Sequence, residues 1–177
     1  MKKSNRLASL FTVAANPGIA ILFALIVTCM LVYGLPALAA GDAIVVIVNP
    51  ANPVDNLSMT ELKKLFLSDR SRWETGKAVA PVMLAAGAPE RTSFLKIVCG
   101  MNDSELSKYF MQAAFSGKSA TPPKEVGSAG AIKSFVASSP GAIGFLKATD
   151  LSSGDASVKA VKVDGVAASD PGYKLKM

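Results

Sequence analysis

Histidine is absent from this 177-residue chain, and cysteine occurs only twice. The missing imidazole removes the commonest general base and the commonest metal ligand from every candidate site. Cys29 lies in an N-terminal apolar segment, and Cys99 stands alone in an apolar helical pattern, which predicts a buried thiol without a disulfide partner. No Gly-x-Ser-x-Gly motif, Cys–His arrangement or metal-ligand spacing is present. The sequence therefore predicts a protein that is not an enzyme and has neither a metal site nor a cofactor.

The first forty residues have the pattern of an export segment. Three basic residues lie among the first six, an apolar run follows over 19–33, and Ala-Leu-Ala ending at residue 39 is a small-x-small cleavage signal. Cleavage there separates a signal peptide, 1–39, from a domain at 40–177. An uncleaved membrane anchor is the alternative, because the apolar stretch is about as long as a bilayer-spanning helix of roughly 20 residues.

The part that remains after the export segment is mildly basic. Removing the export segment lowers the net charge from +6 to +3, because that segment carries three basic residues and no acidic ones. Four lysines at positions 159, 162, 174 and 176 form a basic region with almost no interleaved aromatics. A solvated face is the better interpretation of this pattern, so no nucleic-acid partner is expected.

Apolar runs alternate with helix-start signals, which predicts one α/β domain. The β-branched run at 43–48 is typical of a strand buried on both faces, and Ser58-Met-Thr-Glu61 is a capping box. Strands are expected at 43–48, 79–84, 142–146 and 158–163, and helices from Ser58 to about residue 67, from Pro89 to Gly100, from Asn102 onward and from 129 to 137. The strand at 158–163 alternates apolar residues with lysine, which favours an edge or half-exposed position. The last residues are expected to be loosely held.

The second strand ends in a turn of small residues, 85–88, which we call the Gly87 turn. A helix begins directly after it, and free N–H groups at a helix start favour an anion. Arg91, Thr92 and Ser93 follow as potential donors, so Gly87 and these three residues are the candidate oxyanion-binding set. Pro89 removes one N–H donor, and Glu90 adds a negative charge beside the site. A simple helix cap, with Glu90 satisfying the helix dipole, is the alternative interpretation.

Three segments resemble the substrate-binding proteins of phosphate ABC transporters, specifically the short members of that family. They are Val46–Pro50 with Leu57–Leu67 and Trp73, then Pro81–Val82 with Gly87 and Arg91–Phe94, and finally Ser139–Phe145. The resemblance covers roughly residues 45–146. It implies a type II periplasmic-binding-protein-like α/β domain, essentially one lobe, following the N-terminal signal or anchor helix.

The resemblance also implies a function in the periplasm or cell envelope. It points to an exported, non-catalytic solute-binding protein of an ABC transport system that takes phosphate or another small oxyanion and works with a permease or another envelope protein. In larger members the corresponding turn binds phosphate, but here Ala85 and Ala86 stand where an Arg or Asp is expected. One lobe offers half a cleft, so we expect weak affinity unless a second copy or a partner completes the site. An exported adaptor or sensor module that has lost its ligand is the alternative.

Overall fold

A computed structural model describes residues 43–152 and 154–177, so the export segment predicted at 1–39 lies outside the described residues. The elements are β1 (Ile44–Val48), β2 (Asn56–Leu57), α2 (Met59–Phe66), β3 (Ala80–Leu84), α3 (Pro89–Phe94), the π-helical turn η2 (Leu95–Cys99), α4 (Asp103–Phe115), β4 (Lys124–Val126), α5 (Ala129–Ser138), β5 (Ala142–Lys147), the 3₁₀ turn η3 (Ala148–Asp150) and β6 (Lys159–Val163). None of these described helices is long and apolar enough to span a bilayer.

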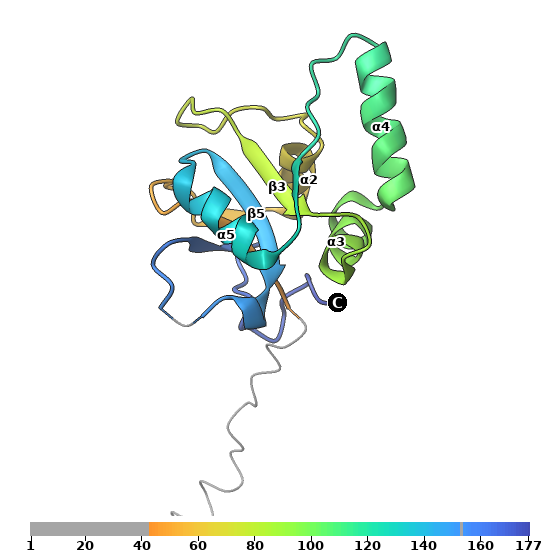
Figure 1. The fold of residues 1–177 in the computed structure, drawn as a ribbon. Helices are drawn as coiled ribbons and strands as arrows, with labels where there is room; N and C mark the ends of the chain where they lie inside the picture. The colour runs from red at the N-terminus through yellow and green to blue at the C-terminus, as the bar shows by residue number, and fades with distance from the viewer. Residues whose placement is uncertain (1–42, 153) are drawn as a thin grey trace, which may run out of the picture. The chain divides into compact units, whose positions relative to one another are not determined.

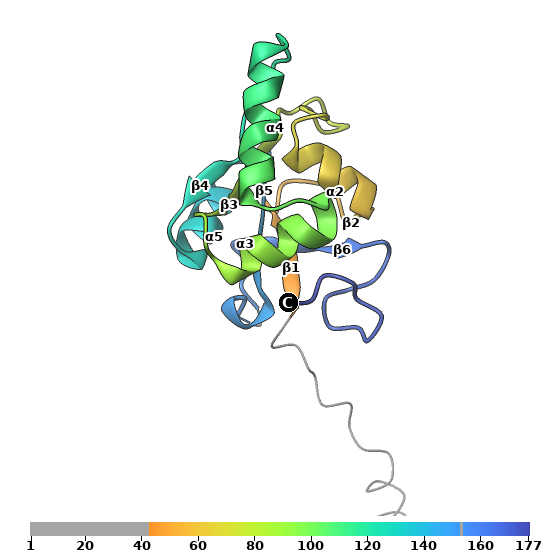
Figure 2. The ribbon, with the colours of Figure 1, turned by 90° about the vertical axis from the view of Figure 1, so that its right-hand side faces the viewer.

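The strands form one mixed sheet in the order β2-β6-β1-β5-β3-β4. β1 runs antiparallel to both of its neighbours, whereas the other contacts between neighbouring strands are parallel. Five strands therefore end at the same edge of the sheet, which we call the carboxyl edge. α5 packs on β5, β3 and β1 from one face, while α2 and α3 lie on the other (Figures 1 and 2). This mixed sheet with helices confirms the predicted α/β fold class.

The central strand β1 is buried along its whole length, as its β-branched sequence predicts. Alternate side chains point to opposite faces of a strand, so Val46 and Val48 join the core under α2 and α3, while Val45 and Ile47 join the core under α5. The first of these cores also contains four phenylalanines from different elements, of which Phe94 and Phe145 stack at 4.0 Å between ring centroids. Sequence-distant elements are thus held together by apolar burial on both faces.

The structure adds two short strands and decides between the two alternatives for a third. The sequence did not predict β2 or β4, because strands of two and three residues are too short to show a periodic pattern. β6 alternates buried and exposed residues, which confirms the half-exposed alternative, and β2 pairs along its outer side, so β6 is not an edge strand. Lys159 and Lys162 stand three positions apart, so they project from opposite faces of an internal strand rather than from the rim.

The prediction of a loosely held C-terminus is wrong. Leu175 is fully buried, and its carbonyl accepts a hydrogen bond from the Ile44 N–H at 2.8 Å. The Tyr173 hydroxyl donates to the Ile44 carbonyl at 2.8 Å, and burial raises the pKa of this phenol. These contacts bind the tail to the start of β1, the kind of long-range pairing that a sequence pattern does not reveal.

A contact between Trp73 and Gly141 holds together two segments that lie far apart in the sequence. Trp73 is 3 % exposed, as expected for a core aromatic, and its indole N–H donates to the Gly141 carbonyl at 2.9 Å. A Cβ at Gly141 would overlap the Ala78 carbonyl oxygen, and one at Gly144 would lie 2.8 Å from Ile132. Only glycine allows these close approaches, so both positions serve the fold.

Candidate functional site

Helix starts cluster at the carboxyl edge of the sheet. α2 follows β2, α3 follows β3 and α5 follows β4, so three helices begin where parallel strands end. In open α/β sheets this is the edge at which ligands bind, because the loops there are free to vary while the sheet fixes their ends. The Gly87 turn lies at this edge, between β3 and α3.

α3 alone among the described α-helices begins without a side-chain cap. Ser58 and Glu61 close the start of α2 with a capping box, Asn102 and Glu105 close α4, and the Ser128 hydroxyl accepts from the third residue of α5. The Ser58 N–H donates to the Glu61 carboxylate, and this bond lowers the pKa of Glu61. The uncapped N–H groups of α3 are therefore the ones left open to an external acceptor.

The geometry of the Gly87 turn follows from its small residues. Gly87 has φ of 90°, a left-handed conformation that other residues rarely adopt. Ala88 is the extended N-cap residue and has no hydroxyl or carboxylate with which to cap the helix. Pro89 occupies the first helical position, where its missing N–H reduces the number of free donors. The turn thus presents backbone and methyl groups to solvent.

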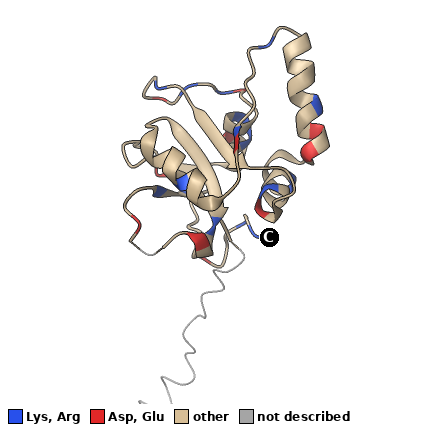
Figure 3. Ribbon diagram, viewed as in Figure 1, with Lys and Arg blue, Asp and Glu red and all other residues tan. Residues whose placement is uncertain are grey.

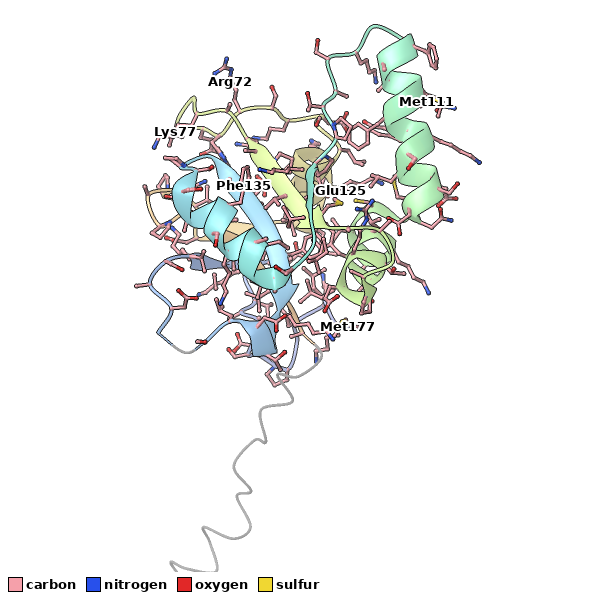
Figure 4. The ribbon with its side chains drawn as sticks, in the orientation of Figure 1. Arg72, Lys77, Met111, Glu125, Phe135 and Met177 are labelled. Atoms are coloured by element: carbon pink, nitrogen blue, oxygen red, sulfur yellow. The ribbon has the colours of Figure 1, made fainter. Side chains whose placement is uncertain are left out.

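Arg91 does not face the open turn. Its side chain is 3 % exposed; Nε donates to Asp103 at 2.5 Å, and Nη1 donates to Glu125 at 2.6 Å and to the Leu84 carbonyl at 2.8 Å. We call this group the Arg91 clamp. Figure 3 shows the acidic first turn of α4 beside α3, and Figure 4 labels Glu125. The guanidinium therefore joins α3 to α4 and β4.

The other residues near the Gly87 turn differ in whether their side chains have partners within the protein. The Thr92 hydroxyl donates back to the Ala88 carbonyl at 3.2 Å, whereas no bond from the Ser93 hydroxyl is found within the described residues. Glu90 is buried and forms an ion pair with Lys147 at 3.4 Å. The structure thus leaves the backbone at Gly87 and the hydroxyl of Ser93 free, and directs Arg91 and Thr92 to internal partners.

The described fold has solved counterparts. It matches a phosphate ABC transporter substrate-binding protein of Clostridium perfringens solved with bound phosphate, at 28 % sequence identity and a TM-score of 0.58 over 72 % of this chain and 47 % of that one. Its fold is that of the phosphate-transporter substrate-binding proteins. An ABC-type phosphate transport receptor of Vibrio cholerae matches at 23 % identity and a TM-score of 0.56, covering 70 % of this chain and 46 % of that one.

A phosphate-binding protein of Stenotrophomonas maltophilia also matches the described fold. It matches at 13 % identity and a TM-score of 0.53, over 79 % of this chain and 47 % of its own. The chain spans about half the length of each of these three solved structures. No protein-family model matches the sequence.

Metal-ligating and thiol groups were the remaining candidates for a functional site. No group of three histidine, cysteine or acidic residues arranged to hold a metal ion occurs in the ranges 43–152 and 154–177. Cys99 is 2 % exposed, and burial raises the pKa of its thiol to about 11. This matches the buried structural thiol expected from the sequence.

Sequence reasoning missed the partners of Arg91 and Glu90. Asp103 and Glu125 lie 12 and 34 residues from Arg91, and Lys147 lies far along the chain from Glu90. Glu125 stands on a three-residue strand that has no sequence signature. The available signal was compositional: an arginine next to Phe94 on an apolar helix face needs acidic partners when that face is buried.

Proposed function

We propose that this chain is an exported, non-catalytic substrate-binding protein of an ABC transport system, with phosphate or a similar small oxyanion as its ligand. The observation that carries the proposal is the fold, which it has in common with solved phosphate-transport proteins, one of them with bound phosphate. The predicted export segment at 1–39 agrees with a function in the periplasm or cell envelope, where an ABC permease would be the partner.

The proposed site is the start of α3. Among residues 43–152 and 154–177, no side chain accepts from the N–H groups of its first turn, and no partner of the Ser93 hydroxyl is found. An oxyanion there would also gain from the positive end of the helix dipole. Two features oppose tight binding. Glu90 places a negative charge near the anion, and Arg91 is already paired with carboxylates of its own chain, so its charge is not available to the ligand.

Titration calorimetry with inorganic phosphate tests the proposal. We expect saturable binding with a dissociation constant weaker than about 1 μM. Ser93→Ala should weaken it several-fold, whereas Ser134→Ala, at an exposed position on α5, should leave it unchanged. Micromolar or tighter binding by a proven monomer would contradict the expectation that half a cleft binds weakly.

A ligand-free adaptor or sensor module is the second candidate. The Arg91 clamp favours it, because the only arginine of the turn region is already satisfied by two carboxylates and a carbonyl. Absence of any heat signal with phosphate, sulfate or arsenate up to several millimolar would favour this candidate over transport. Intact mass of the exported protein tests processing separately, since a start at Ala40 indicates cleavage and the full-length mass indicates an anchor.

A further inference from the structure

A cavity of about 320 Å³ opens at the edge of the sheet opposite the Gly87 turn. Its walls come from the end of α2 and the loop after it, the start of β3, the loop between α4 and β4, and α5. The Ser68 hydroxyl donates to the Thr121 carbonyl at 2.6 Å and joins two of these walls. β3 runs from this cavity to the Gly87 turn and spans roughly 13 Å. The cavity and the turn are therefore separate places on the molecule.

The charges that line the cavity are all positive. Arg70 and Lys124 contribute to its wall together with hydroxyl residues, and no carboxylate lines it. Arg70 also borders a second cavity, where it contacts Glu61 at 3.4 Å and Glu74 at 3.5 Å, both long for ion pairs, and its Nε donates to the Arg72 carbonyl at 3.2 Å. Lys124 is exposed, and within the described residues it has no acidic partner. Both cations can therefore accept a closer anionic partner.

The rest of the cavity is apolar and larger than a simple oxyanion requires. Phe135, labelled on α5 in Figure 4, forms part of the wall, and the Lys124 ammonium lies 4.4 Å from the centre of its ring. Leu65 and Val79 add aliphatic surface. A water molecule occupies about 30 Å³ in the liquid, so a volume of about 320 Å³ holds roughly ten such units. Inorganic phosphate, with five non-hydrogen atoms, would leave much of that space unfilled.

We propose that this cavity binds a small organic anion, a carboxylate or phosphate ester with a flat apolar body. The anionic group would lie between the Arg70 guanidinium and the Lys124 ammonium. There it would replace the two long ion pairs of Arg70 with a shorter one and give Lys124 an anionic partner. The apolar body would cover the Phe135 ring and the aliphatic wall beneath it. Such a mixture of apolar lining and a few polar groups is typical of small-molecule sites. This site is independent of the oxyanion site proposed at α3.

Amide chemical shifts of the full-length chain report the two sites separately. We titrate with three probes: phenyl phosphate, which has both features, inorganic phosphate, which lacks the apolar body, and benzylamine, which reverses the charge. Phenyl phosphate should produce saturable shifts at residues 68–71 and 119–124. Benzylamine and inorganic phosphate should not produce these shifts at the same concentrations. Shifts confined to residues 87–93 would report the proposed oxyanion site instead and would overturn the organic-anion site.

Variants at the cavity rim sharpen the test without disturbing the core. Lys124→Met should weaken phenyl phosphate binding about tenfold, whereas Lys108→Met, at an exposed position on α4, should not. Ser71→Glu, also exposed, places a carboxylate at the cavity and should abolish binding. Equal binding of benzylamine, unchanged affinity in both cavity variants, or no saturable shift up to 20 mM phenyl phosphate (about the weakest binding such a titration detects) would each overturn the proposal.

Discussion

Arg91 and Arg70 show two different uses of the same side chain. Arg91 is buried, with acceptors at 2.5, 2.6 and 2.8 Å, whereas Arg70 is 26 % exposed and its carboxylate partners lie at 3.4 and 3.5 Å. A buried guanidinium must be satisfied or the fold loses stability, so Arg91 is bound to its own chain. A partly exposed guanidinium keeps access to solvent, and the contacts of Arg70 are all 3.2 Å or longer, so a ligand can compete for it. The arginine predicted to bind an anion is thus structural, and the one that sequence reasoning did not select faces a cavity.

The largest expected effect is on stability at Arg91. Arg91→Met should lower the free energy of unfolding by about 3 kcal/mol, because it removes three charge-assisted bonds and leaves a buried carbonyl unpaired. Arg70→Met should cost less than about 1 kcal/mol, as is usual for exposed ion pairs. Urea unfolding of both variants measures the difference. Equal losses would show that the two arginines do not differ in the way proposed.

The two carboxylates of the Arg91 clamp should be unequal. Asp103 is 33 % exposed and Glu125 53 %, so water compensates more fully for the loss of Glu125. We expect Asp103→Asn to cost about 1.5 kcal/mol and Glu125→Gln about half of that. Denaturant midpoints of the two single variants check the order, and a reversed order would place the dominant contact on β4 rather than α4.

Near Arg70 the expected effect is on acid stability. The Ser58 N–H and hydroxyl, with Arg70 as a smaller contributor, hold the pKa of Glu61 below its ordinary value of 4.5. The stabilising contribution is therefore complete above about pH 4.5 and is lost as the pH falls through the lowered pKa. Thermal midpoints measured from pH 6 to 3 should fall less steeply in Glu61→Gln than in the wild type. Identical slopes would exclude Glu61 as a contributor.

The smallest expected effect is the response to salt. Raising NaCl from 0.05 to 1 M shortens the Debye length from about 14 Å to about 3 Å, which screens exposed pairs more than buried ones. A double-mutant cycle for Arg70 and Glu61 should lose most of its coupling energy in high salt. The cycle for Arg91 and Asp103 should keep most of it, and comparable losses in both would argue that the Arg91 clamp is accessible to solvent.

Elements with a strong local pattern were predictable, and those held by remote partners were not. The β-branched run of β1, the capping box of α2 and the glycine that ends η2 each carry their signal within a few residues, and the structure contains all three. β4 has three residues and forms because β3 pairs with it. The C-terminal tail is held by Ile44, more than 120 residues earlier. At the candidate site, the sequence located the helix start but did not indicate the direction of the Arg91 side chain.

The sequence by itself determined the fold class, the order of the longer elements, the absence of imidazole chemistry and the position of the Gly87 turn. These follow from local propensity and residue type, which need no partner. Only the tertiary structure decided which charges are available to a ligand. Arg91 and Arg70 are chemically identical, and burial, together with the distance to the nearest carboxylates, makes one a structural clamp and leaves the other at an open cavity. Those quantities depend on residues brought together from α2, α4 and β4, and folding alone brings them together.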